Sequence, residues 1–178
     1  DQYGCDTPEH AAQLPKLLFT AIKERLGRDF ITEAYVYGEM DHIYTKEFMA
    51  AVIKELEDVV DIVSIKEKDA AANHPTGFQF TKGHHPCFGY AKAIRDTGAM
   101  ELIGVNGGFQ DPQELDGYLA AGDCDLIAMA RGLFADENYM EKCLTGRGED
   151  IVPCIWCNKC HGTMTPPWIS FCSVNPRL

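Results

Sequence analysis

The sequence has few positive charges, no long apolar run and no segment that resembles a secretion signal. Its 178 residues carry 16 Lys and Arg against 27 Asp and Glu, for a formal net charge of -11. Because binding to nucleic acid or to an anionic membrane depends on clustered cations, we expect neither as a partner. No stretch is long enough to span a bilayer, and residues 1–4 have neither a basic region nor an apolar core. These absences predict a cytoplasmic location.

Half of the cysteines do not have the regular spacing that is typical of a disulfide-rich protein. The chain has eight cysteines, and four of them lie singly among helix-like and strand-like segments: Cys5, Cys87, Cys124 and Cys143. Lone cysteines usually pack as small apolar side chains. We therefore interpret these four as free thiols, which suits a reducing compartment.

The other four cysteines are grouped near the end of the chain. Cys154, Cys157 and Cys160 are separated by two residues each, and Cys172 follows further along. Three closely spaced thiols let one loop surround an iron-sulfur cluster, and a fourth completes the coordination. Structural zinc sites usually use two separate Cys-x-x-Cys pairs. The grouping favours an iron-sulfur cluster over zinc, with unliganded or disulfide-bonded cysteines as the remaining alternative.

Strand-like and helix-like patterns alternate along the chain. Apolar residues make up 46% of the sequence and charged residues 24%, as in a globular domain. We predict strands over 30–37, 61–65, 102–105 and 125–130, and helices over 6–26, 45–59, 90–97, 112–121 and 138–144. This alternation requires parallel strands joined by crossover helices. The predicted fold class is α/β, either half of an eight-unit barrel or a small open sheet.

A long connection, Glu67 to Cys87, separates the second predicted strand from its helix. Long connections inside a compact domain are often functional. This one contains Asn73, His74, His84 and His85, which could contact a substrate or a metal. Because paired histidines without a third ligand at fixed spacing are weak evidence of a metal site, we favour a solvated polar loop.

Two glycines, Gly107 and Gly108, follow a predicted strand and precede a predicted helix. Glycines allow the backbone to approach a ligand closely, and the N–H groups at a helix N-terminus favour an anion. The next predicted strand ends in Ala130-Arg131. In (β/α)8 barrels, the loops after the last two strands often form a phosphate site. We therefore predict a cofactor phosphate at Gly107, Gly108 and Arg131, with an ordinary turn and a structural ion pair as alternatives.

Three stretches resemble the old yellow enzyme family of flavin-dependent barrels, in the iron-sulfur branch that contains 2,4-dienoyl-CoA reductase, 2-enoate reductase and trimethylamine dehydrogenase. Residues 1–4 resemble the D-x-Y-G-G motif after the fourth strand, residues 106–108 and 125–136 resemble strands seven and eight, and residues 154–176 resemble the cluster segment that ends in C-x-V-N-P. The resemblance implies that residues 1–150 form the second half of a flavin-binding TIM (β/α)8 barrel, and that residues 151–178 form a 4Fe-4S cluster-binding segment.

The resemblance also implies two cofactors and the residues that bind them. FMN would have its phosphate at Gly107, Gly108, Ala130 and Arg131, and a 4Fe-4S cluster would be held by Cys154, Cys157, Cys160 and Cys172. Tyr35 occupies a flavin-facing position at which the family commonly has an Arg. Cys5 stands where the D-x-Y-G-G motif has its second glycine. The first departure puts a cation beside the reduced flavin in doubt.

The activity that the resemblance implies is NAD(P)H-linked reduction of the C=C bond of an α,β-unsaturated substrate of the enoate or dienoyl-CoA type, with electrons passed through the cluster. We expect the first half of the barrel, with its catalytic residues, before Asp1, and a module for FAD or NAD(P)H after Leu178. The expected partners are a small-molecule substrate and the remainder of the barrel or a partner subunit, within an oligomer. The alternatives are a non-catalytic electron-transfer or scaffold subunit that has lost flavin chemistry, and a zinc-stabilised structural module.

Overall fold

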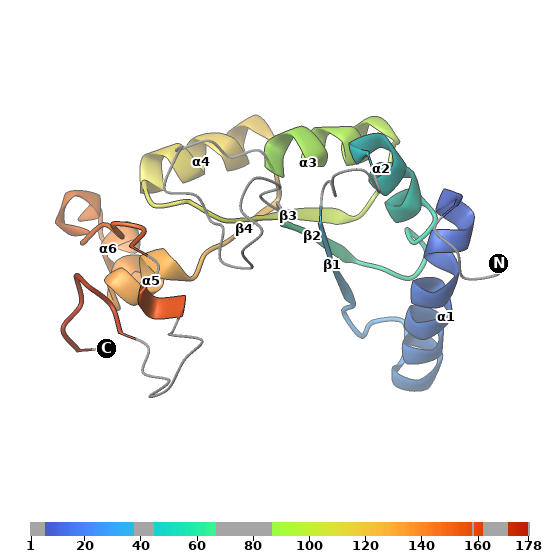
Figure 1. Ribbon diagram of the computed structural model, residues 1–178, viewed down its shortest axis with the longest axis horizontal. Coiled ribbons are helices and arrows are strands. Elements are labelled where there is room, and N and C mark those ends of the chain that lie inside the picture. The colour runs from blue at the N-terminus through green and yellow to red at the C-terminus, as the bar shows by residue number, and fades with distance from the viewer. Residues whose placement is uncertain (1–5, 38–44, 67–86, 158, 162–170, 178) are drawn as a thin grey trace.

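A four-stranded parallel sheet forms the centre of the protein in the computed structural model (Figure 1). The structure describes residues 6–37, 45–66, 87–157, 159–161 and 171–177. The strands pair in sequence order: β1 (Glu33–Tyr37), β2 (Ile62–Lys66), β3 (Leu102–Asn106) and β4 (Leu126–Ala128). The sequence predictions for residues 1–5 and for the histidines between 67 and 87 lie outside the described residues.

Helices precede the first strand, connect the strands and follow the last one. They are α1 (Pro8–Leu26), α2 (Lys46–Lys54), α3 (Cys87–Asp96), α4 (Pro112–Ala121), α5 (Arg131–Ala135) and α6 (Tyr139–Leu144), with 3-10 turns η1 (Gly148–Asp150) and η2 (Lys159–His161). Figure 1 shows α2, α3 and α4 over one face of the sheet. In the same view, α1 lies at one end of the molecule, and α5, α6 and the C-terminal segment lie at the other.

The helices begin and end where the sequence supplies capping groups. Thr7 Oγ1 accepts a hydrogen bond from the N–H of His10 at 3.2 Å, and Thr45 Oγ1 accepts one from the N–H of Phe48 at the same distance. Such caps satisfy backbone donors that have no partner within the helix. At the end of α4, Gly122 adopts a left-handed conformation with φ 74°, which glycine reaches without steric cost.

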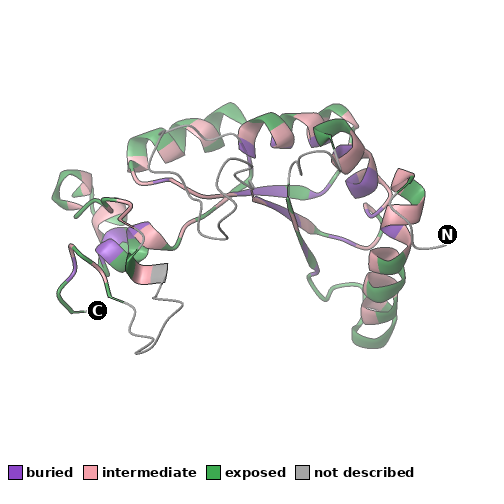
Figure 2. Cartoon of the chain, viewed as in Figure 1, coloured by how far each residue is buried: buried purple, intermediate pink, exposed green. Residues whose placement is uncertain are grey.

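The core lies between the sheet and the helices that cover it (Figure 2). Four of its fully buried side chains come from the two central strands and one from α2: Val63, Ile65, Ile103, Val105 and Ile53. Strands that are covered by helices are expected to contain such continuous β-branched runs. The aromatic rings of Phe88 on α3 and Tyr118 on α4 join these helices, with centroids 4.2 Å apart.

The opposite face of the sheet is open in the described part of the chain. Tyr35, Tyr37, Leu102 and Leu126 are exposed there. The strand register places Tyr37, Lys66, Asn106 and Ala128 in one row at the carboxyl ends of the strands. Because successive side chains alternate between the faces of a strand, this row belongs to the same open face as Tyr35.

The predicted α/β class with parallel strands is confirmed. The sequence analysis missed α5, which has only five residues and directly follows β4. It also extended the last strand to residue 130, whereas β4 ends at Ala128. None of the helices in the described ranges is both long and apolar enough to cross a membrane.

Candidate functional site

A pocket of about 190 Å³ lies at the carboxyl ends of β2, β3 and β4. Its walls come from these strand ends, from the start of α5 and from the cysteine segment: Lys66, Asn106, Gly107, Gly108, Phe109, Met129, Ala130, Arg131, Gly132 and Trp156. In parallel α/β folds, ligands bind at this edge of the sheet because the loops that follow the strands converge there.

The turn after β3 depends on its two glycines. Gly107 has φ 124° and Gly108 has φ 54°, both in the region that disfavours residues with a Cβ atom. The N–H of Phe109 donates to the carbonyl of Gly107 at 2.7 Å, which closes a tight turn. Phe109 is buried, and its ring lies 5.8 Å from that of Phe88, so the turn is anchored in the core. The backbone of Gly107 and Gly108 therefore forms a fixed wall of the pocket.

Among the described residues that line the pocket, two are cationic and none is acidic. The cations are Lys66, at the end of β2, and Arg131, after β4. The chain as a whole has eleven more acidic than basic residues. The positive charge of the pocket therefore has the opposite sign to the net charge of the chain. Burial lowers the pKa of Arg131, while the sulfurs of Cys154 and Cys160 raise it. Arginine keeps its charge in proteins even so, and the pocket is suited to an anion.

Tyr35 does not line the pocket, although it is linked to a residue that does. Its hydroxyl accepts a hydrogen bond from Asn106 Nδ2 at 3.0 Å. The ring lies on the open face of the sheet with 52% of its surface exposed. Burial of the hydroxyl, followed by the nearby Tyr37, raises the pKa of Tyr35. Tyr35 is therefore a neutral group that fixes the Asn106 amide beside the pocket.

The four grouped cysteines follow the pocket in the chain, and all four are free, half-buried thiols. The N–H of Trp156 donates to Cys154 Sγ at 3.3 Å, and Cys157 Sγ donates to Ser173 Oγ at 3.2 Å. The second bond joins the Cys154–Cys160 stretch to the segment around Cys172. Burial raises the pKa of Cys160, and the sulfurs of Cys154 and Cys172 raise it further. The sulfur of Cys160 therefore interacts electrostatically with the sulfurs of Cys154 and Cys172.

The thiols suit a cluster in chemistry, but the described structure does not assemble them as ligands. Iron-sulfur clusters take four thiolates, often with hydrogen bonds to the sulfurs of the kind that Trp156 donates. Yet no three His, Cys, Asp or Glu side chains of the described ranges are close enough together to hold a metal ion. Whether these cysteines hold a cluster therefore stays a prediction.

Trp156 connects the cysteine segment with the pocket. It lies between Cys154 and Cys157 in the chain, and its side chain lines the pocket. Its φ is 50°, the only positive φ at a residue other than glycine in the described ranges. A bulky residue in this conformation is strained and often marks a functional position. The carbonyl of Cys154 also accepts a hydrogen bond from Gln110 Nε2 at 3.0 Å, which ties the same turn to the segment after Phe109.

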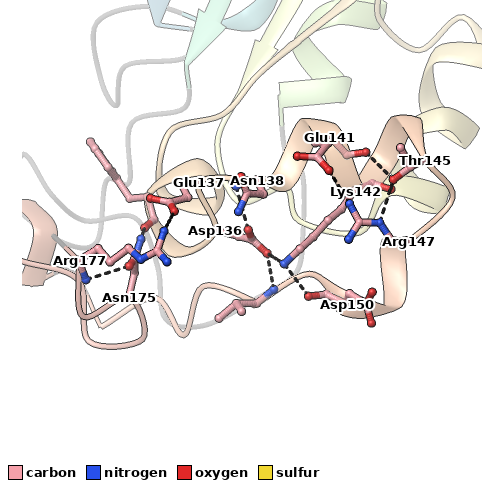
Figure 3. A network of polar contacts seen from close by, with 12 residues as sticks. Asp136, Glu137, Asn138, Glu141, Lys142, Thr145, Arg147, Asp150, Asn175 and Arg177 are labelled. Atoms are coloured by element: carbon pink, nitrogen blue, oxygen red, sulfur yellow. Dashed lines mark hydrogen bonds and ion pairs between the residues drawn. The ribbon is translucent and has the colours of Figure 1, made fainter.

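A network of polar contacts anchors the cysteine segment to α5 and α6 (Figure 3). Asp136 Oδ2 accepts from Lys142 Nζ at 2.6 Å and from the N–H of Val152 at 2.8 Å. Further along, Asn175 Nδ2 donates to the carbonyl of Phe134 at 3.0 Å, and Arg177 pairs with Glu137. These contacts hold the chain before Cys154 and after Cys172 against the helices that follow β4.

The structure brings together most of the flavin-binding residues that the sequence analysis named. Gly107, Gly108, Ala130 and Arg131 line one pocket, whereas Tyr35 lies outside it. The sequence analysis missed Lys66 and Trp156. A lysine at the end of a predicted strand could have been noticed as a pocket residue, but nothing in the sequence indicated that the Trp156 ring turns toward the glycine turn.

Comparison with curated proteins finds relatives that are much longer than this chain. A NADH oxidase of Thermoanaerobacter brockii is 28% identical over 185 residues, which is 99% of this chain and 28% of the relative. A bilirubin reductase of Mediterraneibacter gnavus is 30% identical over 106 residues, or 56% of this chain and 16% of the relative. A metal reductase of Desulforamulus reducens is 28% identical over 89% of this chain and 24% of the relative. No family model matches the sequence.

Solved structures show the same architecture. A 2-naphthoyl-CoA reductase has a TM-score of 0.82 at 24% identity, over 99% of this chain and 27% of that chain. A histamine dehydrogenase from Rhizobium sp. 4-9 has a TM-score of 0.81 at 24% identity, over 99% of this chain and 25% of that chain. An old yellow enzyme homologue from Zymomonas mobilis has a TM-score of 0.61 at 16% identity, over 93% of this chain and 44% of that chain.

The fold and the position of the pocket match one part of the α/β barrels in these solved structures. The chain is similar to long reductases and oxidases and shares the fold of old yellow enzyme-like structures, and it spans about a quarter of the length of the relatives that match most of it.

Proposed function

We propose that the chain is the part of an FMN- and 4Fe-4S-dependent oxidoreductase that binds the flavin phosphate and the cluster. The observation that carries this proposal is the wall shared by the pocket and the cysteine segment. The Gly107-Gly108 turn and Arg131 face a pocket that Trp156 closes from the Cys154–Cys157 turn. An anion site and four free thiols therefore adjoin each other at the carboxyl ends of the strands.

Each group of residues has a separate task in this proposal. Gly107 and Gly108 let the backbone approach the phosphate, Arg131 neutralises its charge, and Asn106 is held in place by the Tyr35 hydroxyl. Cys154, Cys157, Cys160 and Cys172 hold the cluster. When bound, the flavin supplies hydride transfer and the cluster supplies single-electron transfer. The positive charge of Arg131, which interacts with the Cys154 and Cys160 sulfurs, stabilises anionic thiolates beside the pocket.

The substrate that we propose is an α,β-unsaturated compound of the enoate or dienoyl-CoA type, whose C=C bond is reduced with electrons from NAD(P)H. The resemblance of the chain to the old yellow enzyme family supports this class of reaction, and its relatives include a NADH oxidase and a bilirubin reductase. The catalytic acid and base are expected in the remainder of the barrel.

Anaerobic reconstitution with iron and sulfide tests the cluster. We expect equal amounts of bound iron and acid-labile sulfide, a broad absorbance band in the visible range and an EPR signal after reduction. Cys157→Ser should lose most of the bound iron, because cluster binding requires all four thiolates. Cys143→Ser is the matched control, since Cys143 lies on α6 outside the group.

Two outcomes would contradict the cluster. If Cys157→Ser and Cys143→Ser bind as much iron as the wild type, Cys157 is no ligand. If elemental analysis of anaerobically purified protein finds zinc in place of iron, the chain is a zinc-stabilised structural module.

A second candidate function is an electron-transfer or scaffold subunit that has lost flavin chemistry. The neutral Tyr35 favours it, because this side chain lies where the family commonly places a cation. The FMN content of the intact assembly distinguishes the two functions. About one FMN for each chain supports the oxidoreductase, and a flavin-free assembly that retains its cluster supports the scaffold.

We also propose that the open face of the sheet is covered by a complementary half barrel, from the same polypeptide or from a partner subunit. The exposed side chains of this face are largely apolar, and they include Tyr35, Tyr37, Leu102 and Leu126. β1 and β4 are the edges of the described sheet, and each can accept a further strand. The relatives that this chain matches extend well beyond the matched region.

A further inference from the structure

We propose that Lys66 is a second phosphate-binding residue of the pocket and acts together with Arg131 on one phosphate monoester. The inference rests on the proposed flavin function and extends it by a residue. Lys66 ends β2, and its Cα pairs with that of Asn106 at the end of β3. Its backbone is therefore fixed beside the Gly107-Gly108 turn, and its side chain lines the pocket.

The charges of the pocket match a phosphate monoester. Such a group carries between one and two negative charges at neutral pH. Arg131 alone leaves much of this charge uncompensated, and Lys66 provides the second cation. No carboxylate is among the described residues that line the pocket, although the chain has a net charge of -11. The pocket therefore favours a doubly charged anion over a neutral or singly charged group.

The two cations reach the pocket from opposite sides of β3. Lys66 comes from β2 and Arg131 from the segment after β4, while the glycine turn after β3 lies between them. Arginine presents a planar fork of donors, and lysine presents a compact charge. An anion that rests on the glycine turn is thus enclosed by charge on both flanks. This arrangement discriminates FMN from riboflavin, which has the same ring system and no phosphate.

The test is flavin binding to the intact protein after removal of its flavin, measured by fluorescence titration with FMN and with riboflavin. We expect Lys66→Met to weaken FMN binding about tenfold or more, since charge-assisted hydrogen bonds contribute about 1.5–3 kcal/mol. Riboflavin affinity should change less than twofold. Lys66→Arg should recover most of the FMN affinity. Lys92→Met is the control for net charge, because Lys92 is exposed on α3 and pairs with Asp96.

The outcomes separate this inference from the proposed function. If the wild type binds FMN and Lys66→Met binds it equally well, Lys66 does not contact the phosphate, and the flavin proposal is unaffected. A parallel loss of FMN and riboflavin affinity by Lys66→Met, with unchanged thermal unfolding, would also overturn the phosphate assignment. If the wild type binds neither flavin, the proposed function fails and this inference fails with it.

Discussion

Asp136, directly after α5, makes several polar contacts that hold the chain leading to the cysteines. It is buried, and its carboxylate accepts hydrogen bonds from Lys142 Nζ, from the N–H of Asn138 at 3.0 Å and from the N–H of Val152. Burial alone would raise the pKa of Asp136, but these hydrogen bonds outweigh it and hold the pKa below the usual value of 3.8. The charged form is thus favoured in the folded protein.

Asp136→Asn should lower the free energy of unfolding by about 2 kcal/mol at neutral pH, because the half-buried Lys142 loses the counterion that the buried Asp136 provides. The stabilisation by Asp136 is present above the ordinary Asp pKa of 3.8 and disappears as the pH falls through the lower, folded value. In urea unfolding, the difference in free energy of unfolding between wild type and Asp136→Asn should therefore shrink as the pH falls below 3.8.

Glu141→Gln provides the comparison for this residue. Glu141 is exposed and pairs with Arg147 at 2.6 Å, and an exposed ion pair contributes about 0–1 kcal/mol. Equal destabilisation by the two substitutions would show that the contacts of Asp136 do not anchor the segment.

At the scale of residues, the sequence predicted those site residues whose chemistry is local. The glycines and Arg131 follow strand-like patterns, and the structure places them in one pocket. Lys66 and Trp156 were missed because their participation depends on register and on a strained backbone. Lys66 faces the pocket through its pairing with Asn106, and Trp156 does so at a positive φ.

At the scale of elements, an acidic residue directly precedes each of three strands. Asp125 precedes β4. Its N–H donates to the carbonyl of Ile103, and the N–H of Ile103 donates to Asp125 Oδ2 at 2.7 Å. Asp61 precedes β2 and makes the same pair of contacts with Thr32. Glu101 precedes β3 at the equivalent place. It is 6% exposed, and neither of its oxygens has a hydrogen-bond partner in the described structure.

Glu101→Gln should raise the free energy of unfolding at pH 7 by about 1 kcal/mol, since a buried carboxylate without a partner is unfavourable. Burial, with a contribution from Glu57, raises the pKa of Glu101 above 4.5. The penalty for the charged form therefore applies above this raised value, and the gain of the variant should shrink as the pH falls toward 4.5.

Asp125→Asn is the matched substitution at the start of the next strand, and its effect should have the opposite sign. It weakens the bonds that Asp125 accepts from Ile103 and from Arg95 at 2.8 Å, so the free energy of unfolding should fall by about 1 kcal/mol. Thermal and urea unfolding measure both variants, and a loss of stability in Glu101→Gln would contradict this account of β3.

The longer elements could be predicted from the sequence because their patterns are strong. α1, α4 and all four strands lie close to their expected ranges, since capping residues and β-branched runs mark their positions. The short helix α5 could not be predicted, because five residues contain too little of the helical period. The parallel direction of the strands followed from the alternation of strand and helix, but their order in the sheet and the exposure of one sheet face did not.

At the scale of the whole molecule, α1 has an apolar stripe on its surface. Leu17 and Leu18 are each 57% exposed, and Leu14 is 60% exposed one turn earlier. An apolar area of this kind usually marks an interface, and under our proposal the complementary half barrel covers it.

Replacing Leu17 and Leu18 together by Glu should prevent association with the complementary half barrel, because it places two charges in an apolar contact. The stability of this chain alone should change by about 0.5 kcal/mol or less, since both side chains are exposed. Light scattering coupled to size exclusion measures the mass of the assembly. Leu144→Glu, at the end of α6 with an exposed side chain, should leave that mass unchanged.

The strictly sequential order of the strands also has a kinetic consequence. Each strand pairs with the next one in the chain, so paired residues such as Glu33 and Ile62, or Gly104 and Leu126, are close in sequence. Each pairing closes a single crossover connection, so it costs less conformational entropy than pairing a strand with one that lies two or more units away. The sheet can therefore grow by one strand at a time during synthesis, with each new strand joining an edge that is already formed.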